Sequence, residues 1–372
     1  MKKIWSVLIA AIILRLFLSF FTSHPDLEAL AAGGKIVSQG NILNLYDQSS
    51  DALVLNYPPL IYWFFGFFNL FLGGLLALLK LPYLFFDLMI GFLLMRMVEP
   101  KKGVLVFGIW MFNPVNLYST YMMGQFDIIP TFFSILSIYF ALKNKLNYAA
   151  LALGMGIAFK LYPVFLIIPL VLLGSSIKDK LKILLLTALP YILSILPYVS
   201  SESFRSTALI ANQSSKSLYA SIPVSGGEAI LLFPAFLIFF YLLILRQANK
   251  ASLWKFYLIP LLLFFTLTHY HPQWLIWMTP FLILDLVVNR FKNIIPVVLI
   301  FGSWFGSLFF FDPSLTLGMF APLNPSLKTI PDIWTLLNIN MDFNFSRSML
   351  QTILAGSSIY LIFHFLSNKE NA

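Results

Sequence analysis

Runs of about twenty apolar residues recur along almost the whole length of this 372-residue chain. As a helix, each run is long enough to cross a bilayer, in which backbone polar groups must be hydrogen-bonded within the protein. Apolar residues make up 59% of the sequence and charged residues 10%, against about a quarter charged in soluble domains. The sequence therefore predicts an all-α fold, a polytopic transmembrane helical bundle with about 12 crossings.

One integral-membrane domain over residues 1–372 is expected, because no internal repeat is visible and no segment is polar enough for a separate soluble domain. The first apolar run ends in bulky aromatic residues, whereas a signal peptide ends at small residues, so we expect it to be retained as a span. The chain has no Cys, which excludes disulfides, thiolate zinc sites and a Cys nucleophile and favours a prokaryotic plasma membrane.

The net charge of +9 indicates the cytoplasmic bias of Lys and Arg in membrane proteins rather than nucleic-acid binding. Lys2 and Lys3 place the N-terminus inside, and residues 57–98 make one net crossing with one part at the interface or re-entrant. Further spans are predicted near 103–122, 128–142, 147–159, 161–175, 181–199, 229–245, 256–268, 274–289, 294–310 and 349–366. The expected extracytoplasmic loops are 23–56, 200–228 and 311–348.

The stretch TYMMGQFDIIPTFF carries Asp127 and Gln125 inside a long apolar region. The predicted orientation puts both residues at the outer turn between spans 103–122 and 128–142. We therefore expect the Asp127 carboxylate to face the extracytoplasmic side rather than the hydrocarbon.

The segment SHPDLEALAAGGKIVS directly follows the first span. Ser23 is expected to cap a helix with Pro25 in its first turn, and apolar residues at helical spacing predict an amphipathic juxtamembrane helix over 25–38. Asp26 then lies at the helix N-terminus, where the dipole favours the ionised form that a general base requires. The alternative is that Asp26 and Glu28 only provide the negative charge of a helix start.

Lys160 splits a long apolar stretch, at the outer end of a tight hairpin of spans. Such a lysine either meets an anion or extends its ammonium to the interface. His269 and His271 lie at another outer turn, where they bind a phosphate or serve as interfacial aromatic residues. Arg15 and Asp87 lie within spans, and we expect them to form an ion pair because charges in membranes tend to pair.

An ordered set of short motifs resembles the GT-C superfamily of polyprenyl-phosphate-dependent glycosyltransferases over roughly residues 10–285. The similarity is to the branch with the first mannosyltransferase of GPI anchors and related prokaryotic mannosyltransferases. Its motifs here are the acidic residues after the first span, GNILNLYD, YPPL, FDLMIGFLL, WMFNPVNLYSTYMMGQFDIIPTFF, GIAFKLYPVFL and HPQWLIWMTPF.

The resemblance implies transfer of a monosaccharide, mannose in this branch, from a polyprenyl-phosphate donor to a glycolipid or glycan acceptor on the extracytoplasmic face, with inversion. It places the catalytic base at Asp26, with Glu28 as the second acid. Family members often carry Asp-x-Asp there, whereas this chain has Asp-Leu-Glu, so no metal is assigned although a divalent ion would be compatible.

The chemistry needs cations for the departing phosphate, a role that fits Lys160, His269 and His271. Asp127, Gln125 and Tyr57 are the residues expected to orient substrate hydroxyls.

Two other functions use a similar set of residues. A lipid or glycan transporter (flippase) would show inverted repeats and binding groups at the bilayer midplane. A glycan ligase or polymerase would act on the same face with the same kind of donor. The clustering of polar residues at one face favours the glycosyltransferase, with a polyprenyl-phosphate sugar, a glycolipid or glycan acceptor and the bilayer as partners, and no nucleic acid.

The predicted orientation can be tested with single cysteines, since the native chain has none. A Cys at Ser38 or Ser215 should react with a membrane-impermeant thiol reagent in intact cells. A Cys at Lys145, in an expected inner turn, should react only after lysis. The opposite pattern would show that the chain is inserted the other way round.

Overall fold

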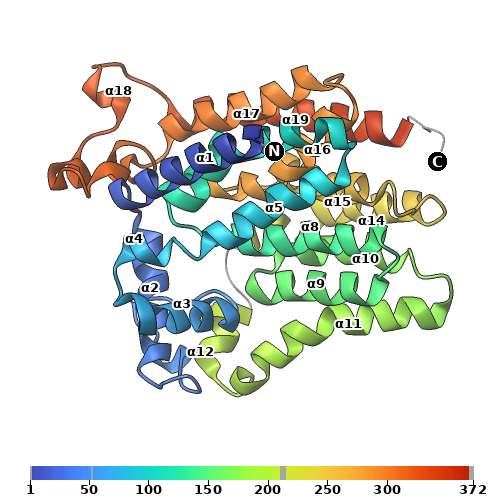
Figure 1. Ribbon diagram of the computed structural model, residues 1–372, viewed down its shortest axis with the longest axis horizontal. Coiled ribbons are helices and arrows are strands. Elements are labelled where there is room, and N and C mark those ends of the chain that lie inside the picture. Colours follow the sequence, from blue (N-terminus) through green and yellow to red (C-terminus); the bar gives the residue numbers. More distant parts are fainter. Residues whose placement is uncertain (1, 52, 210–214, 368–372) are drawn as a thin grey trace.

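The computed structural model describes residues 2–51, 53–209 and 215–367. The side chains of Lys2 and Lys3, and residues 52 and 210–214 of two expected external loops, lie outside the described residues. Helices predominate, and Figure 1 shows most of them running along the long axis of the molecule. The helices α2, α3, α4, α12 and α18 gather at one end, on the left of the view.

The longer helices have the following bounds: α1 Lys2–Phe21, α2 Pro25–Ser38, α3 Pro59–Leu72, α5 Tyr83–Met97, α6 Gly103–Met111, α8 Ile128–Leu142, α9 Leu146–Phe159, α11 Ile177–Ile195, α14 Leu232–Ile244, α15 Leu253–Leu267, α16 Thr279–Val288, α17 Ile294–Ser307 and α19 Phe343–Ser367. The short ones are α4 Leu76–Leu79, α7 Pro114–Asn116, α10 Ile167–Val171, α12 Glu202–Phe204 and α18 Ile333–Leu336. Two further helical segments shape the site: the π-helix η3, Leu117–Met122, and the 3₁₀-helix η8, Pro272–Trp277.

Within the described residues, four helical stretches are long and apolar enough to cross a membrane, namely Ile4–Phe21, Leu76–Met97, Ile177–Tyr198 and Phe343–Ser367. Eight shorter apolar helices accompany them. These findings confirm a helical, membrane-type fold, and the number of crossings stays a prediction.

Two expectations about secondary structure are wrong in detail. The span expected over 103–122 is broken after α6, because Asn113 caps a new helix whose first residue is Pro114. The end of the loop 200–228 and the beginning of the expected span 229–245 form an antiparallel hairpin of β1 (Ser221–Ser225) and β2 (Glu228–Leu231). Strand β2 passes directly into α14.

The amphipathic helix predicted over 25–38 is present as α2, with Pro25 at its first position. His24 rather than Ser23 is the cap: its Nδ1 accepts a hydrogen bond from the Asp26 amide at 3.2 Å. The reason is that proline favours the first helical position, which makes the residue before it the cap.

Helix α2 packs closely against α3 through small residues. A Cβ atom on Gly34 would lie 2.5 Å from Cβ of Phe65, and one on Gly66 would lie 2.6 Å from Cγ1 of Val37. Larger residues would force the two helices apart, so these glycines determine how close α2 lies to the bundle.

Asp87 on α5 is fully buried and accepts hydrogen bonds from four side chains. The donors are Arg15 Nε at 2.5 Å, Tyr121 Oη at 2.7 Å, and Trp110 Nε1 and Asn116 Nδ2 at 2.8 Å each. The expected Arg15–Asp87 ion pair is thereby confirmed. It joins α1 to α5, and the other donors add α6, α7 and η3.

Lys80, also fully buried, joins the end of α1 to the end of η3. Its ammonium donates to the carbonyl oxygens of Thr22 and Tyr121, both at 2.7 Å, and lies 3.3 Å from that of Met122. Carbonyl groups at the C-terminal end of a helix carry partial negative charge, which stabilises a cation there.

The Arg15–Asp87 pair predicts a non-additive pattern of stability. Arg15→Met alone should destabilise the protein by about 3–5 kcal/mol, because it leaves a buried carboxylate without its cation. Asp87→Leu added to Arg15→Met should recover part of that loss. The measurement is thermal unfolding of the purified variants in detergent, and a double variant less stable than either single one would contradict the pairing.

Candidate active site

The segment Gly124–Gln125–Phe126–Asp127 links η3 to α8 and contacts α2. Gly124 has a φ of +76°, and a Cβ on it would lie 2.7 Å from Cδ2 of Leu27. Glycine is required for both reasons, because other residues are strained at this φ and would collide with α2. The close approach lets the buried Gln125 donate from Nε2 to Asp26 Oδ2 at 2.5 Å.

Asp26 opens into a cavity of about 320 Å³ at the end of the bundle where α2 lies. Its side chain is 40% exposed and is held by the Gln125 amide, while Nδ1 of His24 lies 3.6 Å from the other carboxylate oxygen. The cavity is also lined by His24, Asn56, Tyr57, Tyr62, His271, Gln273 and Ser314. The side-chain oxygens of Gln125 and Gln273 that would accept hydrogen bonds are buried and have no partner among the described residues.

His24 is a neutral imidazole in this setting. Burial lowers its pKa, although the nearby carboxylate of Asp26 acts in the opposite direction. Because Nδ1 accepts the amide hydrogen of Asp26, the ring proton lies on Nε2, which points toward the Ser314 hydroxyl at 3.5 Å. The Ser314 segment therefore closes one side of the cavity.

Asp127 and Lys160 form a buried ion pair, with 2.7 Å between Nζ of Lys160 and Oδ1 of Asp127. The indole nitrogen of Trp277 donates to the same oxygen at 2.5 Å. The Lys160 ammonium also lies within 6 Å of four aromatic rings, those of Tyr57, Phe126, Trp274 and Trp277. The lysine thus lies at the turn of the predicted hairpin, where its charge is already balanced by a carboxylate and ring faces.

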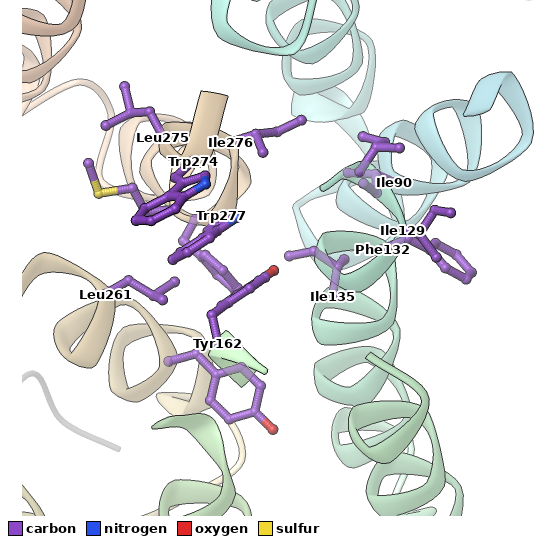
Figure 2. Packing of buried hydrophobic residues seen from close by; sticks show 14 of the residues in the cluster. Ile90, Ile129, Phe132, Ile135, Tyr162, Leu261, Trp274, Leu275, Ile276 and Trp277 are labelled. Carbon is purple, nitrogen blue, oxygen red and sulfur yellow. The ribbon is translucent and has the colours of Figure 1, made fainter. Parts of the chain in front are cut away.

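A second cavity, of about 310 Å³ and mostly apolar, lies on the other side of Tyr57. Its aromatic wall is a stack: the Tyr162 and Trp277 rings are 4.2 Å apart and nearly parallel, and Trp274 lies 5.2 Å beyond. Figure 2 shows these aromatic side chains on one side, with Ile135 of α8 pointing toward Trp277 from the other. Asn56 and Tyr57 line both cavities, so the two are adjacent.

Tyr57 lies between the two carboxylates of the site. Burial raises the pKa of its phenol well above the usual value, and the negative charges of Asp26 and Asp127 raise it further. The hydroxyl therefore keeps its proton and can donate a hydrogen bond to a ligand in either cavity.

His271 and His269 line different cavities, although the centroids of their rings are only 5.9 Å apart. His271 lines the Asp26 cavity, and its Nε2 lies 2.9 Å from the ammonium of Lys216. Burial, together with the charges of Lys216, His269 and Lys160, lowers the pKa of His271 to about 4. His269 lines a third cavity and is therefore not next to Asp26.

Glu28 is exposed and is not among the residues that line the Asp26 cavity. It lies half a turn beyond Asp26, so the helix carries the two carboxylates on different faces. Of the residues predicted to act together, the structure gathers Asp26, Gln125, Tyr57, His271, Lys160 and Asp127.

Two residues of the site were missed from the sequence. Lys216 belongs to the external loop expected over 200–228, which could close over a substrate, but the sequence gives this lysine no role of its own, and it gives none to Gln273. The Gln273 position within HPQWLIWMTPF, two residues after His271, was the available signal. No comparable pattern marks Lys216. Among residues 2–51, 53–209 and 215–367, no three His, Asp or Glu side chains are grouped as metal ligands.

The lowered pKa of His271 predicts a contribution to acid sensitivity. Folding lowers this pKa from 6.5 to about 4, so the unfolded chain binds an extra proton between these values. The stability contribution is fully present above pH 6.5 and is lost as the pH falls toward 4. His271→Gln should therefore show a smaller decrease in Tm between pH 7.5 and 5 than the wild type, whereas His364→Gln, in the last turn of α19, should not. Equal decreases in all three proteins would contradict a neutral, buried His271.

Comparison with known proteins places this architecture in a family. Over 124 residues the chain is 26% identical to GPI mannosyltransferase 1 of Saccharomyces cerevisiae, an alignment that covers 31% of this chain and 28% of that protein. The chain thus matches well under a third of that relative's length. The family model described as GPI transamidase subunit PIG-U matches residues 9–277, from α1 to η8. That match includes every residue that lines the Asp26 cavity except Ser314 and Leu315, and the chain belongs to the PIG-U family.

Proposed function

We propose that this protein is a membrane glycosyltransferase that moves a monosaccharide, mannose, from a polyprenyl-phosphate donor to a lipid-linked or glycan acceptor on the extracytoplasmic face. The observation that carries the proposal is the Asp26 carboxylate, which Gln125 orients in a polar cavity that shares Tyr57 with an apolar aromatic cavity. A donor of this class has a sugar, a phosphate and an apolar chain, and adjacent polar and apolar cavities suit that combination.

In the proposed reaction, Asp26 accepts the proton of an acceptor hydroxyl as the oxygen attacks the anomeric carbon of the sugar. The bond from that carbon to the phosphate oxygen breaks, its electron pair leaves with the phosphate, and attack from the opposite side inverts the configuration. Gln273 lines the cavity, and its side-chain oxygen has no partner among the described residues, which supports a ligand rich in hydroxyl groups. Tyr57, which lines both cavities, completes the set of orienting groups, and Asp127 acts through its ion pair with Lys160.

The departing phosphate requires cations. Lys160 keeps this role in the proposal, and Lys216 joins it as a second cation. His271, 2.9 Å from the Lys216 ammonium, is neutral and would contribute hydrogen bonding rather than charge. His269 is not included here, because it lines another cavity. The aromatic stack of Trp274, Trp277 and Tyr162 would hold the first isoprene units of the donor.

A second candidate function follows from the description of the family, a subunit of GPI transamidase. In that role the cavities would bind a glycolipid for another protein, and Asp26 would not act as a base. The flippase and the glycan ligase or polymerase also remain alternatives. Purified protein assayed with polyprenyl-phosphate monosaccharides separates these functions, because only the first transfers a single sugar by itself.

Substitutions of the two acidic residues test the assignment of the base. Asp26→Asn keeps the size and hydrogen bonding of the side chain but cannot accept a proton. Since a positioned base contributes about 10²–10⁴-fold, turnover should fall by that factor while donor binding persists. Glu28→Gln is the matched control and should have a small effect, because Glu28 is exposed beside the cavity.

Reversed effects of the two substitutions would assign the base to Glu28. A folded Asp26→Asn protein with unchanged sugar transfer would rule out base catalysis by Asp26. Complete absence of transfer by the wild-type protein, with glycolipid binding intact, would favour the transamidase-subunit role.

A further inference from the structure

A third cavity, of about 470 Å³, lies where the C-terminal end of α15, the end of α17 and the first turns of α19 meet. Figure 1 shows α17 and α19 side by side, and the two helices are in contact. Thr268 and His269 form one wall, and Ser307, Phe311, Arg347 and Gln351 form the others. This third cavity shares no described residue with the Asp26 cavity or with the aromatic cavity. The walls from α17 and α19 lie beyond residue 277, the end of the family match.

Arg347 supplies the positive charge of this cavity. Its guanidinium lies 5.1 Å from the centroid of the Phe311 ring, and Nη2 donates to Asn344 Oδ1 at 2.6 Å. These two contacts hold the planar group in place. Within the described part of the chain, Arg347 forms no ion pair with a carboxylate. An oriented guanidinium without a counter-charge suits the oxygens of a phosphate.

The other polar groups of the cavity support an anion. Thr268 is 2% exposed, and its hydroxyl has no hydrogen-bond partner among the described residues. Burial lowers the pKa of His269, and the charges of Lys216 and Arg347 lower it further, as expected where the potential is positive. Among the described residues, no Asp or Glu lines the cavity.

The surroundings of the cavity indicate a lipid rather than a soluble anion. Phe305 on α17 and Met349 and Ile353 on α19 are large apolar side chains that are left exposed. In a membrane-type fold such faces lie against acyl chains. An anion-binding cavity at the end of these helices thus adjoins an exposed apolar surface. A lipid combines the same two features, because it has a charged headgroup and apolar acyl chains.

We propose that this cavity binds the phosphate-bearing headgroup of a membrane lipid, with Arg347 as the main phosphate ligand and the Thr268 hydroxyl as a further donor. The acyl chains then lie along α17 and α19. This inference goes beyond the proposed function, because it concerns residues that take no part in the chemistry at Asp26.

The test uses the native absence of Cys. Ser348 lines the cavity and is exposed, so Ser348→Cys in the full-length protein in detergent reports occupancy by its rate of reaction with a maleimide. Phosphatidic acid should slow this reaction, whereas diacylglycerol with the same acyl chains should not. Arg347→Gln should raise the half-protecting concentration of phosphatidic acid about ten- to a hundredfold, because a charged hydrogen bond is lost.

Three controls make the result specific. Arg205→Gln also removes one positive charge, but from a position that does not line the cavity, and should leave protection unchanged. Ser225→Cys, on the exposed β1, should react at the same rate with and without phosphatidic acid. Asp26→Asn should leave protection at Ser348→Cys unchanged, so that failure of the sugar-transfer proposal and failure of this one can be told apart.

Equal protection by diacylglycerol would overturn the proposal, as would protection that is unaffected by Arg347→Gln. Inorganic phosphate that protects as well as phosphatidic acid would assign the cavity to a free phosphate and overturn the lipid assignment. Should Arg347→Gln fail to fold, the comparison of the two lipids on the Ser348→Cys protein still decides.

Discussion

Asp87 accepts hydrogen bonds from side chains of α1, α6, α7 and η3 while it lies fully buried on α5. A carboxylate in an apolar bundle is tolerated only with such partners, and each partner restricts the position of its own helix. Four separate segments are thereby aligned around one group. The chain leaves this group through η3 and reaches Gly124 and Gln125 directly afterwards. The position of Asp26 in its cavity therefore depends on contacts made at Asp87.

The site contains two carboxylates in different environments. Asp127 is buried and shares one oxygen with the Lys160 ammonium and the Trp277 indole, so its charge is balanced inside the protein. Asp26 is partly exposed and is held by an amide, which leaves it open toward the cavity. Such differences between neighbouring acids are how proteins assign separate roles to the same functional group. Tyr57, which keeps its proton between them, connects the polar cavity to the aromatic one.

The sequence predicts well those features that depend on local pattern or on strong physical necessity. The helix over 25–38 follows from its apolar spacing and Pro25, and the pairing of Arg15 with Asp87 follows from the rule that charges in membranes find partners. The capping by His24, the break at Pro114 and the β-hairpin require knowledge of local backbone geometry. The approach of Lys216 to His271, and of Lys160 to Asp127, depends on how distant segments pack. Single residues in separate turns carry no sequence signal for such pairings.

The Lys80 ammonium is surrounded by backbone carbonyl oxygens from the ends of α1 and η3. Helix α2 begins three residues after Thr22, and Gly124 lies two residues after Met122. The Lys80 ammonium therefore holds together the two segments that position Asp26, namely the start of α2 and the Gly124–Gln125 turn. The opposite wall of the cavity, as far as the structure describes it, is not held by this ammonium. That wall carries Lys216 and His271, and it is built from the turn before η8 and the segment that leads into the β-hairpin. The proposed base thus lies on the wall that Lys80 anchors, whereas Lys216, whose ammonium contacts His271, belongs to the wall that Lys80 does not contact.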